Sequence, residues 1–245
     1  MLKWFLNKKE KACEVLDFSV LKTDIHSHFI PGIDDGAPDM EASITLIKKM
    51  QELGFSKVIT SPHVMSDFYQ NSSEIILNGL ADVRAELKVQ NINMDIEAAA
   101  EYYIDYEFEQ KIGKEKFLTF GDNYILVELS FMEAPRNLFD IIFKLQLEGY
   151  KVVLAHPERY GYYKQEDYDN LVNRGVLLQI NLLSLIGHYS PQIKKKTEQL
   201  IAKGQVSFVG TDCHNMNHAE LYEKCQTKKA WHDLVNSGKL LNATL

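Results

Sequence analysis

The chain alternates between short apolar runs rich in valine and isoleucine and longer stretches that mix apolar with charged residues. Short β-branched runs bounded by turn residues predict buried strands, and apolar residues that recur every three or four positions predict helices. On this pattern we predict seven strands, within residues 20–26, 57–60, 94–103, 124–130, 151–156, 176–181 and 206–212. We predict six helices, within residues 39–53, 72–87, 137–148, 165–174, 191–203 and 219–236.

The first two predicted helices carry start and stop signals. Asp39 can cap the first helix, with Glu41 in its first turn, and Gly54 follows its last apolar position. Ser72 or Ser73 can cap the second. A capping side-chain oxygen accepts one of the free N–H groups of the first turn, and glycine tolerates the left-handed conformation that ends many helices.

Nearly every predicted strand is followed by a predicted helix. Apolar strands covered by helices are typical of an α/β fold with a parallel sheet. With about seven such units we expect closure into a barrel resembling (β/α)8, and an open doubly wound sheet is the alternative. No proline-, glycine- or serine-rich linker divides the chain, so we expect a single domain over residues 21–245 after an N-terminal extension, residues 1–20. No glycine-rich nucleotide-binding motif occurs.

Histidine and carboxylate residues stand at the carboxyl end of nearly every predicted strand. In chain order these strand-end residues are His26, His28, His63, Glu101, Glu128, His156, Asn181, Asp212 and His214. In a parallel barrel these ends share one face, which is where such barrels place their active sites. We therefore expect the imidazole and carboxylate side chains to bind several divalent ions, Mn, Fe or Zn. The absence of cysteine from the set disfavours a structural zinc site.

Spacing and context support this convergence. His26 and His28 are two positions apart, so both side chains point to the same face of an extended strand. Asp24 shares that face and is a candidate acceptor for the ring of a ligand histidine. Glu128 stands inside the apolar run LVELS, where a carboxylate is costly to bury unless it is paired or bound to metal.

Taken singly, these residues have simpler interpretations. A histidine at a strand end is usually a hydrogen-bonded polar residue, and Glu101 could lie on the surface of an edge strand. Asp34 and Asp35 could merely form a turn before the first helix. Joint occurrence favours the metal site, because chance would not place the same chemistry at the same end of nearly every strand. We expect Cys213 to face the core by parity.

Two further groups of residues are assigned no firm role. We expect three histidines to be surface or loop residues: His188, His218 and His232. Five tyrosines flank the proposed site segments and could line its mouth or be ordinary surface residues: Tyr102, Tyr103, Tyr160, Tyr162 and Tyr163.

Composition narrows the class of partner and the compartment. The net charge of −7 argues against nucleic acid as the partner, because binding to a duplex depends on lysine and arginine contacts to phosphate. The cysteines Cys13, Cys213 and Cys225 form no disulfide framework, which favours a reducing, cytoplasmic location. None of them is followed by arginine in the Cys-x5-Arg spacing of a cysteine-dependent phosphatase loop.

The N-terminal segment MLKWFLNKKEKA is too short in its apolar part for a secretory signal, and no stretch of the chain has the length of a transmembrane segment. Its apolar start and the lysines that follow could form an interfacial membrane anchor. We prefer an N-terminal arm packed on the domain.

The ordered segments DIHSHFIPGIDDG, SPH, AEYY, VELS, AHPERY and GTDCHN resemble the polymerase-and-histidinol-phosphatase (PHP) superfamily. More closely, they resemble its bacterial protein-tyrosine phosphatases of capsule and exopolysaccharide operons. The similarity runs over residues 23–215. It implies the PHP fold, a distorted (β/α)7 TIM-like barrel, with three divalent metal ions that are often manganese.

The resemblance also implies a role for each matching residue. The implied metal ligands are His26, His28, Asp35, His63, Glu101, Glu128, His156, Asp212 and His214. Asp35, rather than Asp34, is chosen only by its match to the IDDG segment, and Glu101 would bridge two metals. Arg159, in HPERY, matches a catalytic arginine that binds the substrate phosphate. After GTDCHN some relatives carry a further arginine, where this chain has Asn217, His218 and Glu220, so His218 could partly substitute for it.

We therefore predict a cytoplasmic, metal-dependent protein-tyrosine phosphatase that hydrolyses phosphotyrosine with a hydroxide generated at the metals and without a cysteine nucleophile. The resemblance implies a bacterial tyrosine autokinase as the phosphoprotein partner, in the control of polysaccharide export. One alternative is a phosphatase for histidinol phosphate or another small phosphomonoester on the same scaffold. An alternative of another class is a non-catalytic, metal-stabilised binding domain.

Overall fold

The computed structural model describes residues 13–245, and all of its strands pair in parallel. The strands are β1 (Thr23–Asp24), β2 (Lys57–Thr60), β3 (His63–Val64), β4 (Asp95–Ala98), β5 (Glu101–Tyr103), β6 (Tyr124–Glu128), β7 (Lys151–Ala155), β8 (Leu177–Asn181) and β9 (Val206–Gly210). The helices are α1 (Met40–Glu52), α2 (Ser73–Val89), α3 (Tyr106–Lys111), α4 (Leu138–Leu147), α5 (Gln165–Asn173), α6 (Pro191–Ala202), α7 (Met216–Ala219) and α8 (Lys229–Asn236). Short 3₁₀ helices are η1 (Phe18–Val20), η2 (Pro157–Arg159), η3 (Leu182–Ile186), η4 (Tyr222–Cys225) and η5 (Asn242–Thr244).

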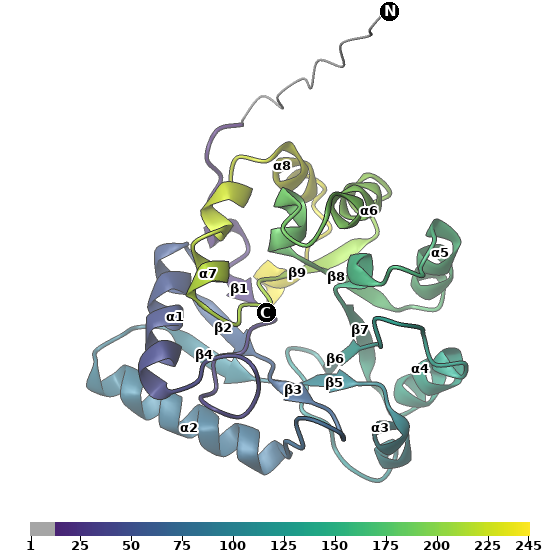
Figure 1. Ribbon diagram of the computed structural model, residues 1–245, viewed down its shortest axis with the longest axis horizontal. Coiled ribbons are helices and arrows are strands. Elements are labelled where there is room, and N and C mark those ends of the chain that lie inside the picture. Colours follow the sequence, from purple (N-terminus) through teal and green to yellow (C-terminus); the bar gives the residue numbers. More distant parts are fainter. Residues whose placement is uncertain (1–12) are drawn as a thin grey trace, which may run out of the picture.

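The strands form two parallel sheets, and the chain runs directly from the first sheet into the second at two places. One sheet has the order β1-β2-β4 and the other the order β3-β5-β6-β7-β8-β9. The chain passes from β2 into β3, and from β4 into β5, after only a few residues, so the predicted strand at 94–103 is real but interrupted. Figure 1 shows the larger helices on the outside and the strands inside. The predicted α/β class and parallel pairing are confirmed.

Strand β1, at one end of the first sheet, approaches β9, at one end of the second, but no continuous ladder of hydrogen bonds joins them. Ser27, after β1, and Cys213, after β9, form an isolated parallel bridge. The N–H of Asp212 donates to the carbonyl oxygen of His26 at 2.7 Å. Asn242 also spans the two strands, because its amide group bonds the backbone of Val209 and the carbonyl of Thr23.

The helix caps follow the sequence signals. Asp39 accepts a hydrogen bond from the N–H of Ala42 at 2.9 Å and so caps α1. Ser72, not Ser73, caps α2 by accepting from the N–H of Ile75. Each cap satisfies a free N–H of the first turn and fixes where the helix leaves the strand-end loop.

Two predicted elements need correction, and one helix is additional. The first strand is far shorter than residues 20–26, because η1 occupies its start and Lys22 adopts a left-handed φ of 61°. Helix α3 was not predicted. The last helix, predicted over 219–236, breaks into α7, η4 and α8. The carbonyls of Gln226 and Thr227 accept from backbone N–H groups of residues 16 and 13, which removes them from a continuous helix.

The described part of the N-terminal extension packs against α8. The indole N–H of Trp231 donates to the carbonyl of Leu16, and the ring of Phe18 lies 5.2 Å from that of Trp231. The apolar segment for which membrane anchoring was considered lies outside the described residues. Among residues 13–245, no helix combines the length and the apolar character that a membrane crossing requires.

Candidate metal and phosphate site

All the predicted metal ligands lie in one group at the carboxyl ends of the strands. His26 and His28 follow β1, while His63 and Glu101 begin β3 and β5, the continuations of β2 and β4. Glu128 ends β6. We call the whole set the His/carboxylate cluster: His26, His28, Asp35, His63, Glu101, Glu128, His156, Asp212 and His214.

Glu101 is the centre of the His/carboxylate cluster. Its Oε2 atom lies 3.1 Å from Nε2 of His26 and 3.1 Å from Nδ1 of His63. Its Oε1 atom lies 3.0 Å from Nε2 of His156. The side chain is completely buried, so the surface position considered for Glu101 is excluded. Its two oxygens therefore face different imidazoles, an arrangement in which each oxygen would be available to a separate cation.

Ligand atoms in the cluster gather into three overlapping groups. Within each group one ligand atom per residue lies within 4.8 Å of the others. The groups are His28, Asp35, His63 and His214; His26, His28 and Glu101; and His63, Glu101 and Glu128. Asp35, not Asp34, faces His63 and His214, at 3.5 and 3.4 Å.

Acceptors behind the cluster orient its imidazole rings. Nδ1 of His28 lies 2.7 Å from Asp34 Oδ2, and Nδ1 of His26 lies 2.8 Å from Gln179 Oε1. Such contacts fix which ring nitrogen is left for a metal. Sequence reasoning proposed Asp24 for this role. Asp24 instead accepts from the backbone and hydroxyl of Thr211, so the acceptor for the His26 ring is Gln179.

Several cluster atoms are buried without any hydrogen-bond partner among the described residues. They are Nε2 of His26, Nε2 of His28, Nδ1 of His63 and Oε2 of Glu101. Buried polar atoms are rarely left unsatisfied, because desolvation without a partner costs about 1–3 kcal/mol each. These atoms face one another, so divalent cations would satisfy all of them together.

The backbone brings the cluster together at some conformational cost. His156 and Asp212 adopt left-handed φ angles of 35° and 53°, a conformation that is uncommon for non-glycine residues and that recurs at functional sites. Glycine is needed at two close approaches. A Cβ atom on Gly36 would lie 2.2 Å from the carbonyl oxygen of His28, and one on Gly210 would lie 2.6 Å from Cβ of His26.

Charge in the cluster is only partly balanced by protein groups. Burial, and then the neighbouring Glu101 and Asp212 carboxylates, raise the pKa of Glu128 well above its usual value. Burial, and then the Arg159 guanidinium, lower the pKa of His156 to about 4. Crowded carboxylates beside a neutral imidazole are a favourable environment for added cations.

A cavity of about 370 Å³ opens over the cluster. Arg159 lines it, and its Nη1 atom donates to Oδ2 of Asp212 at 3.0 Å. Asn181 donates to the same oxygen at 2.6 Å, whereas Oδ1 of Asp212 faces His26 and His28 at 3.5 Å each. The cavity therefore brings imidazole and carboxylate groups that could hold cations together with the guanidinium of Arg159.

The walls of this cavity also hold residues that sequence reasoning missed or misplaced. His218, expected at the surface or in a loop and also considered as a substitute for a phosphate-binding arginine, lines it, which agrees with both expectations. Phe131 and Tyr189 line it too, whereas none of the five tyrosines singled out from the sequence does. Cys213 is buried as predicted, and burial raises the pKa of its thiol, which opposes a role as nucleophile.

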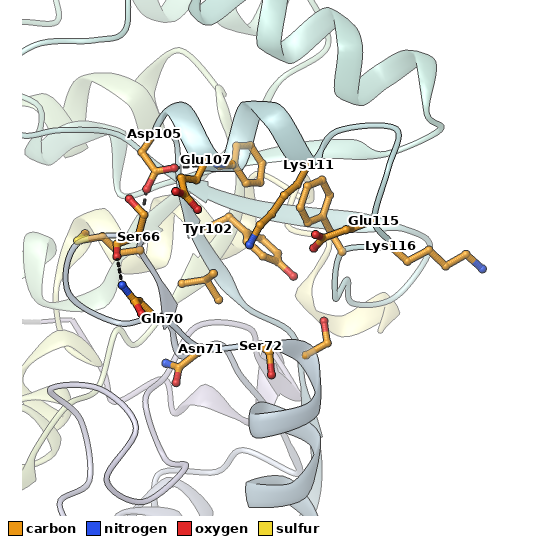
Figure 2. Close-up of a pocket in the computed structure, with 15 residues that line it drawn as sticks. Ser66, Gln70, Asn71, Ser72, Tyr102, Asp105, Glu107, Lys111, Glu115 and Lys116 are labelled. Carbon is orange, nitrogen blue, oxygen red and sulfur yellow. Dashed lines mark hydrogen bonds between the residues drawn. The ribbon is translucent and has the colours of Figure 1, made fainter.

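A second cavity, of about 360 Å³, lies on the opposite side of β3 and β5 (Figure 2). Val64 and Tyr102 line it, one position along the chain from His63 and Glu101, so alternation along the strands separates the two cavities. The hydroxyl of Tyr102 accepts from the N–H of Leu118. No member of the His/carboxylate cluster lines this second cavity.

Comparison with known proteins gives consistent matches along most of the chain. The family model described as capsular polysaccharide synthesis, CpsB/CapC, matches residues 22–233. The tyrosine-protein phosphatase YwqE of Bacillus subtilis is 32% identical over 196 residues, 79% of this chain and 77% of that protein. The putative tyrosine-protein phosphatase CapC of Staphylococcus aureus is 24% identical over 229 residues, 89% of this chain and 90% of that protein.

A solved structure shares the fold. It is described among crystal structures of YwqE from Bacillus subtilis and CpsB from Streptococcus pneumoniae, unique metal-dependent tyrosine phosphatases. It superposes with a TM-score of 0.79 at 28% identity and covers 91% of this chain and 94% of its own.

Proposed function

Because the chain belongs to the CpsB/CapC family of capsular polysaccharide synthesis, we propose that it is a metal-dependent protein-tyrosine phosphatase. One observation carries the proposal: the cluster holds buried, unpartnered imidazole and carboxylate atoms, and other members of the same cluster line one cavity together with Arg159. Cations and arginine together are the recurring means of holding and neutralising a phosphoryl group.

We propose that the cluster holds three divalent ions, with manganese as our choice and iron or zinc as alternatives. The three overlapping ligand groups, which share His28, His63 and Glu101, support this number. Ligands that are only nitrogen and oxygen suit all three metals. His156, Asp212 and the remaining cluster members would complete the coordination.

Divalent ions bound there would supply positive charge against the phosphate and a source of hydroxide near neutral pH. The protein's own groups then bind and orient the substrate. Arg159 has five N–H donors, and its hydrogen bond to Asp212 leaves several for the phosphate oxygens. Asp212 and Asn181 keep the guanidinium at the wall of the cavity.

The leaving group and the cysteines fit this reaction. The phenol of tyrosine has a pKa of about 10, so its oxygen needs less help from a general acid than an alkoxide does. Cys213 is buried with its sulfur turned from the cavity, and Cys225 is buried too, so neither is placed to attack phosphorus.

For the scaffold, we propose a distorted (β/α)7 barrel that forms one domain over residues 21–245. The Ser27–Cys213 bridge and the contacts of Asn242 support closure between β1 and β9. For the partner, we propose a bacterial tyrosine autokinase in the cytoplasm. The capsular polysaccharide description of the family supports that choice.

The test is phosphate release from a phosphotyrosine peptide by the purified protein, first chelated and then resupplied with Mn²⁺. We expect activity to disappear on chelation and to return with manganese. Histidinol phosphate serves as the competing substrate, and a higher kcat/KM for it would replace our proposal with the small-substrate alternative. A folded, metal-loaded protein that cleaves neither compound would instead support the binding-domain alternative.

A further inference from the structure

The guanidinium of Arg159 lies over two aromatic rings. Its Cζ atom is 4.7 Å from the ring centroid of Phe131 and 4.6 Å from that of Tyr189. Only one hydrogen bond from this guanidinium to another residue occurs in the described part of the chain, the contact with Asp212. A single bond would let the planar group swing about that bond, whereas rings over it restrict the plane.

Each ring is itself held by further contacts, and for Phe131 these include the cluster ring of His156, with ring centroids 5.9 Å apart. The hydroxyl of Tyr189 accepts a hydrogen bond from the Asn181 side chain at 3.1 Å. Phe131 packs on Tyr160, with ring centroids 5.7 Å apart. The hydroxyl of Tyr160 donates to the carbonyl of Ala155 and accepts from the N–H of Leu129, so it ties the Phe131 loop to the Arg159 loop. These contacts restrict the positions of both rings.

We propose that Phe131 and Tyr189 are positioning residues that clamp the Arg159 guanidinium in the plane required to bind the substrate phosphate. We call them the aromatic clamp. The inference rests on the proposed function, because it assigns the free N–H edge of Arg159 to phosphate. A long side chain that is already fixed loses little conformational entropy when the ligand binds, so the ligand binds more tightly.

The clamp predicts an effect that depends on the presence of Arg159. Phe131→Leu and Tyr189→Leu remove one ring each, and Tyr189→Phe keeps the ring but loses the contact with Asn181. Phe143→Leu is the matched control, because Phe143 is also an exposed aromatic residue, 59% accessible, but lies on α4 and does not line the cavity. Each variant is made in the wild-type and the Arg159→Ala background.

The probe is inorganic phosphate, titrated calorimetrically into the manganese-loaded protein, with metal content measured alongside. We expect Phe131→Leu and Tyr189→Leu to weaken phosphate binding about 10-fold with metal content unchanged. Tyr189→Phe should retain most of the affinity, and Phe143→Leu all of it. In the Arg159→Ala background the leucine variants should change affinity less than about 2-fold, because the group they position is gone.

Equal losses in both backgrounds would overturn the clamp, since the rings would then act without the arginine. Unchanged affinity in the wild-type background, or a metal-loaded wild-type protein that binds no phosphate, would overturn it as well. Failure of the proposed function gives a different result. In that case the protein would cleave no phosphotyrosine peptide, while phosphate binding would still depend on both rings and on Arg159.

Discussion

Asp34 Oδ2 lies 2.7 Å from Nδ1 of His28, and the opposite nitrogen of that ring faces the carboxylates of Glu101 and Asp212. The two adjacent aspartates of the IDDG segment therefore have different positions. Asp34 is buried behind the ring and also accepts from the backbone of Gly36 and His63. Asp35 is 54% exposed at its side chain and faces the cavity.

This division predicts different consequences for the two aspartates. In Asp34→Asn the orienting acceptor of His28 is weakened while the ligand set is kept, so we expect metal affinity to fall about 10- to 100-fold. Excess manganese should restore turnover. In Asp35→Asn a proposed ligand carboxylate is removed, and excess metal should restore little. Metal titration followed by phosphate release measures both. Full turnover of Asp35→Asn at stoichiometric metal would remove Asp35 from the ligand set.

Gly210→Ala should disturb the site through packing alone. The new Cβ atom would lie 2.6 Å from Cβ of His26 and 2.8 Å from Nε2 of Gln179, which displaces a proposed ligand and its acceptor together. Overpacking of this kind costs about 1–3 kcal/mol, so we expect a lower Tm and a loss of bound metal.

The matched control is Gly161→Ala, because nothing lies within 4 Å of a Cβ atom at that position. Thermal unfolding and metal analysis of both variants show whether the close approach at Gly210 affects stability and metal binding. If Gly210→Ala melted and bound metal as Gly161→Ala does, the close approach of β9 to His26 would have no energetic consequence.

The sequence predicts most of the site because the signal is carried by residue types at strand ends. Glu128 stands out within VELS, since a carboxylate in an apolar run requires a partner. The role of Gln179 has no such signal. An uncharged amide in a strand does not indicate a function. Its contact with the His26 ring depends on how two segments align, and the two residues are 153 positions apart. The same holds for Tyr189, whose ring reaches Arg159 from a separate loop.

The fold is also predictable where local sequence signals determine it. It is not predictable where segments far apart in the chain form backbone hydrogen bonds that end a helix. The caps of α1 and α2 are local, so the sequence predicts Asp39 for the first and Ser72 or Ser73 for the second, of which the structure uses Ser72. The break between α7 and α8 depends on residues 13 and 16 bonding to Thr227 and Gln226. Helical periodicity alone cannot indicate that contact, because the partners are more than 200 residues apart.

Cys213→Ser should keep most of the turnover on a phosphotyrosine peptide. The thiol is buried beside proposed ligands but lies outside the cavity, so only the cost of burying a hydroxyl is expected, about 1–3 kcal/mol of stability. The Tm of the variant is measured by thermal unfolding, and turnover is assayed below that Tm so that folded protein is compared. Loss of activity with metal content and fold retained would contradict the metal-dependent mechanism.

Metal binding should also appear in stability, independently of turnover. Cations at the proposed site would satisfy the unpartnered atoms around Glu101 in the folded protein, and a ligand that prefers the folded state raises the free energy of unfolding by mass action. We expect chelation to lower the Tm of the wild-type protein and Mn²⁺ to restore it, by several degrees at saturating metal.

Glu101→Gln keeps the volume of the side chain but removes the central charge, so the Tm of this variant should respond weakly to manganese. Phe143→Leu, remote from the cluster, should respond as the wild type does. A wild-type Tm that is the same with chelator and with manganese would show that the cluster does not bind metal in the folded protein.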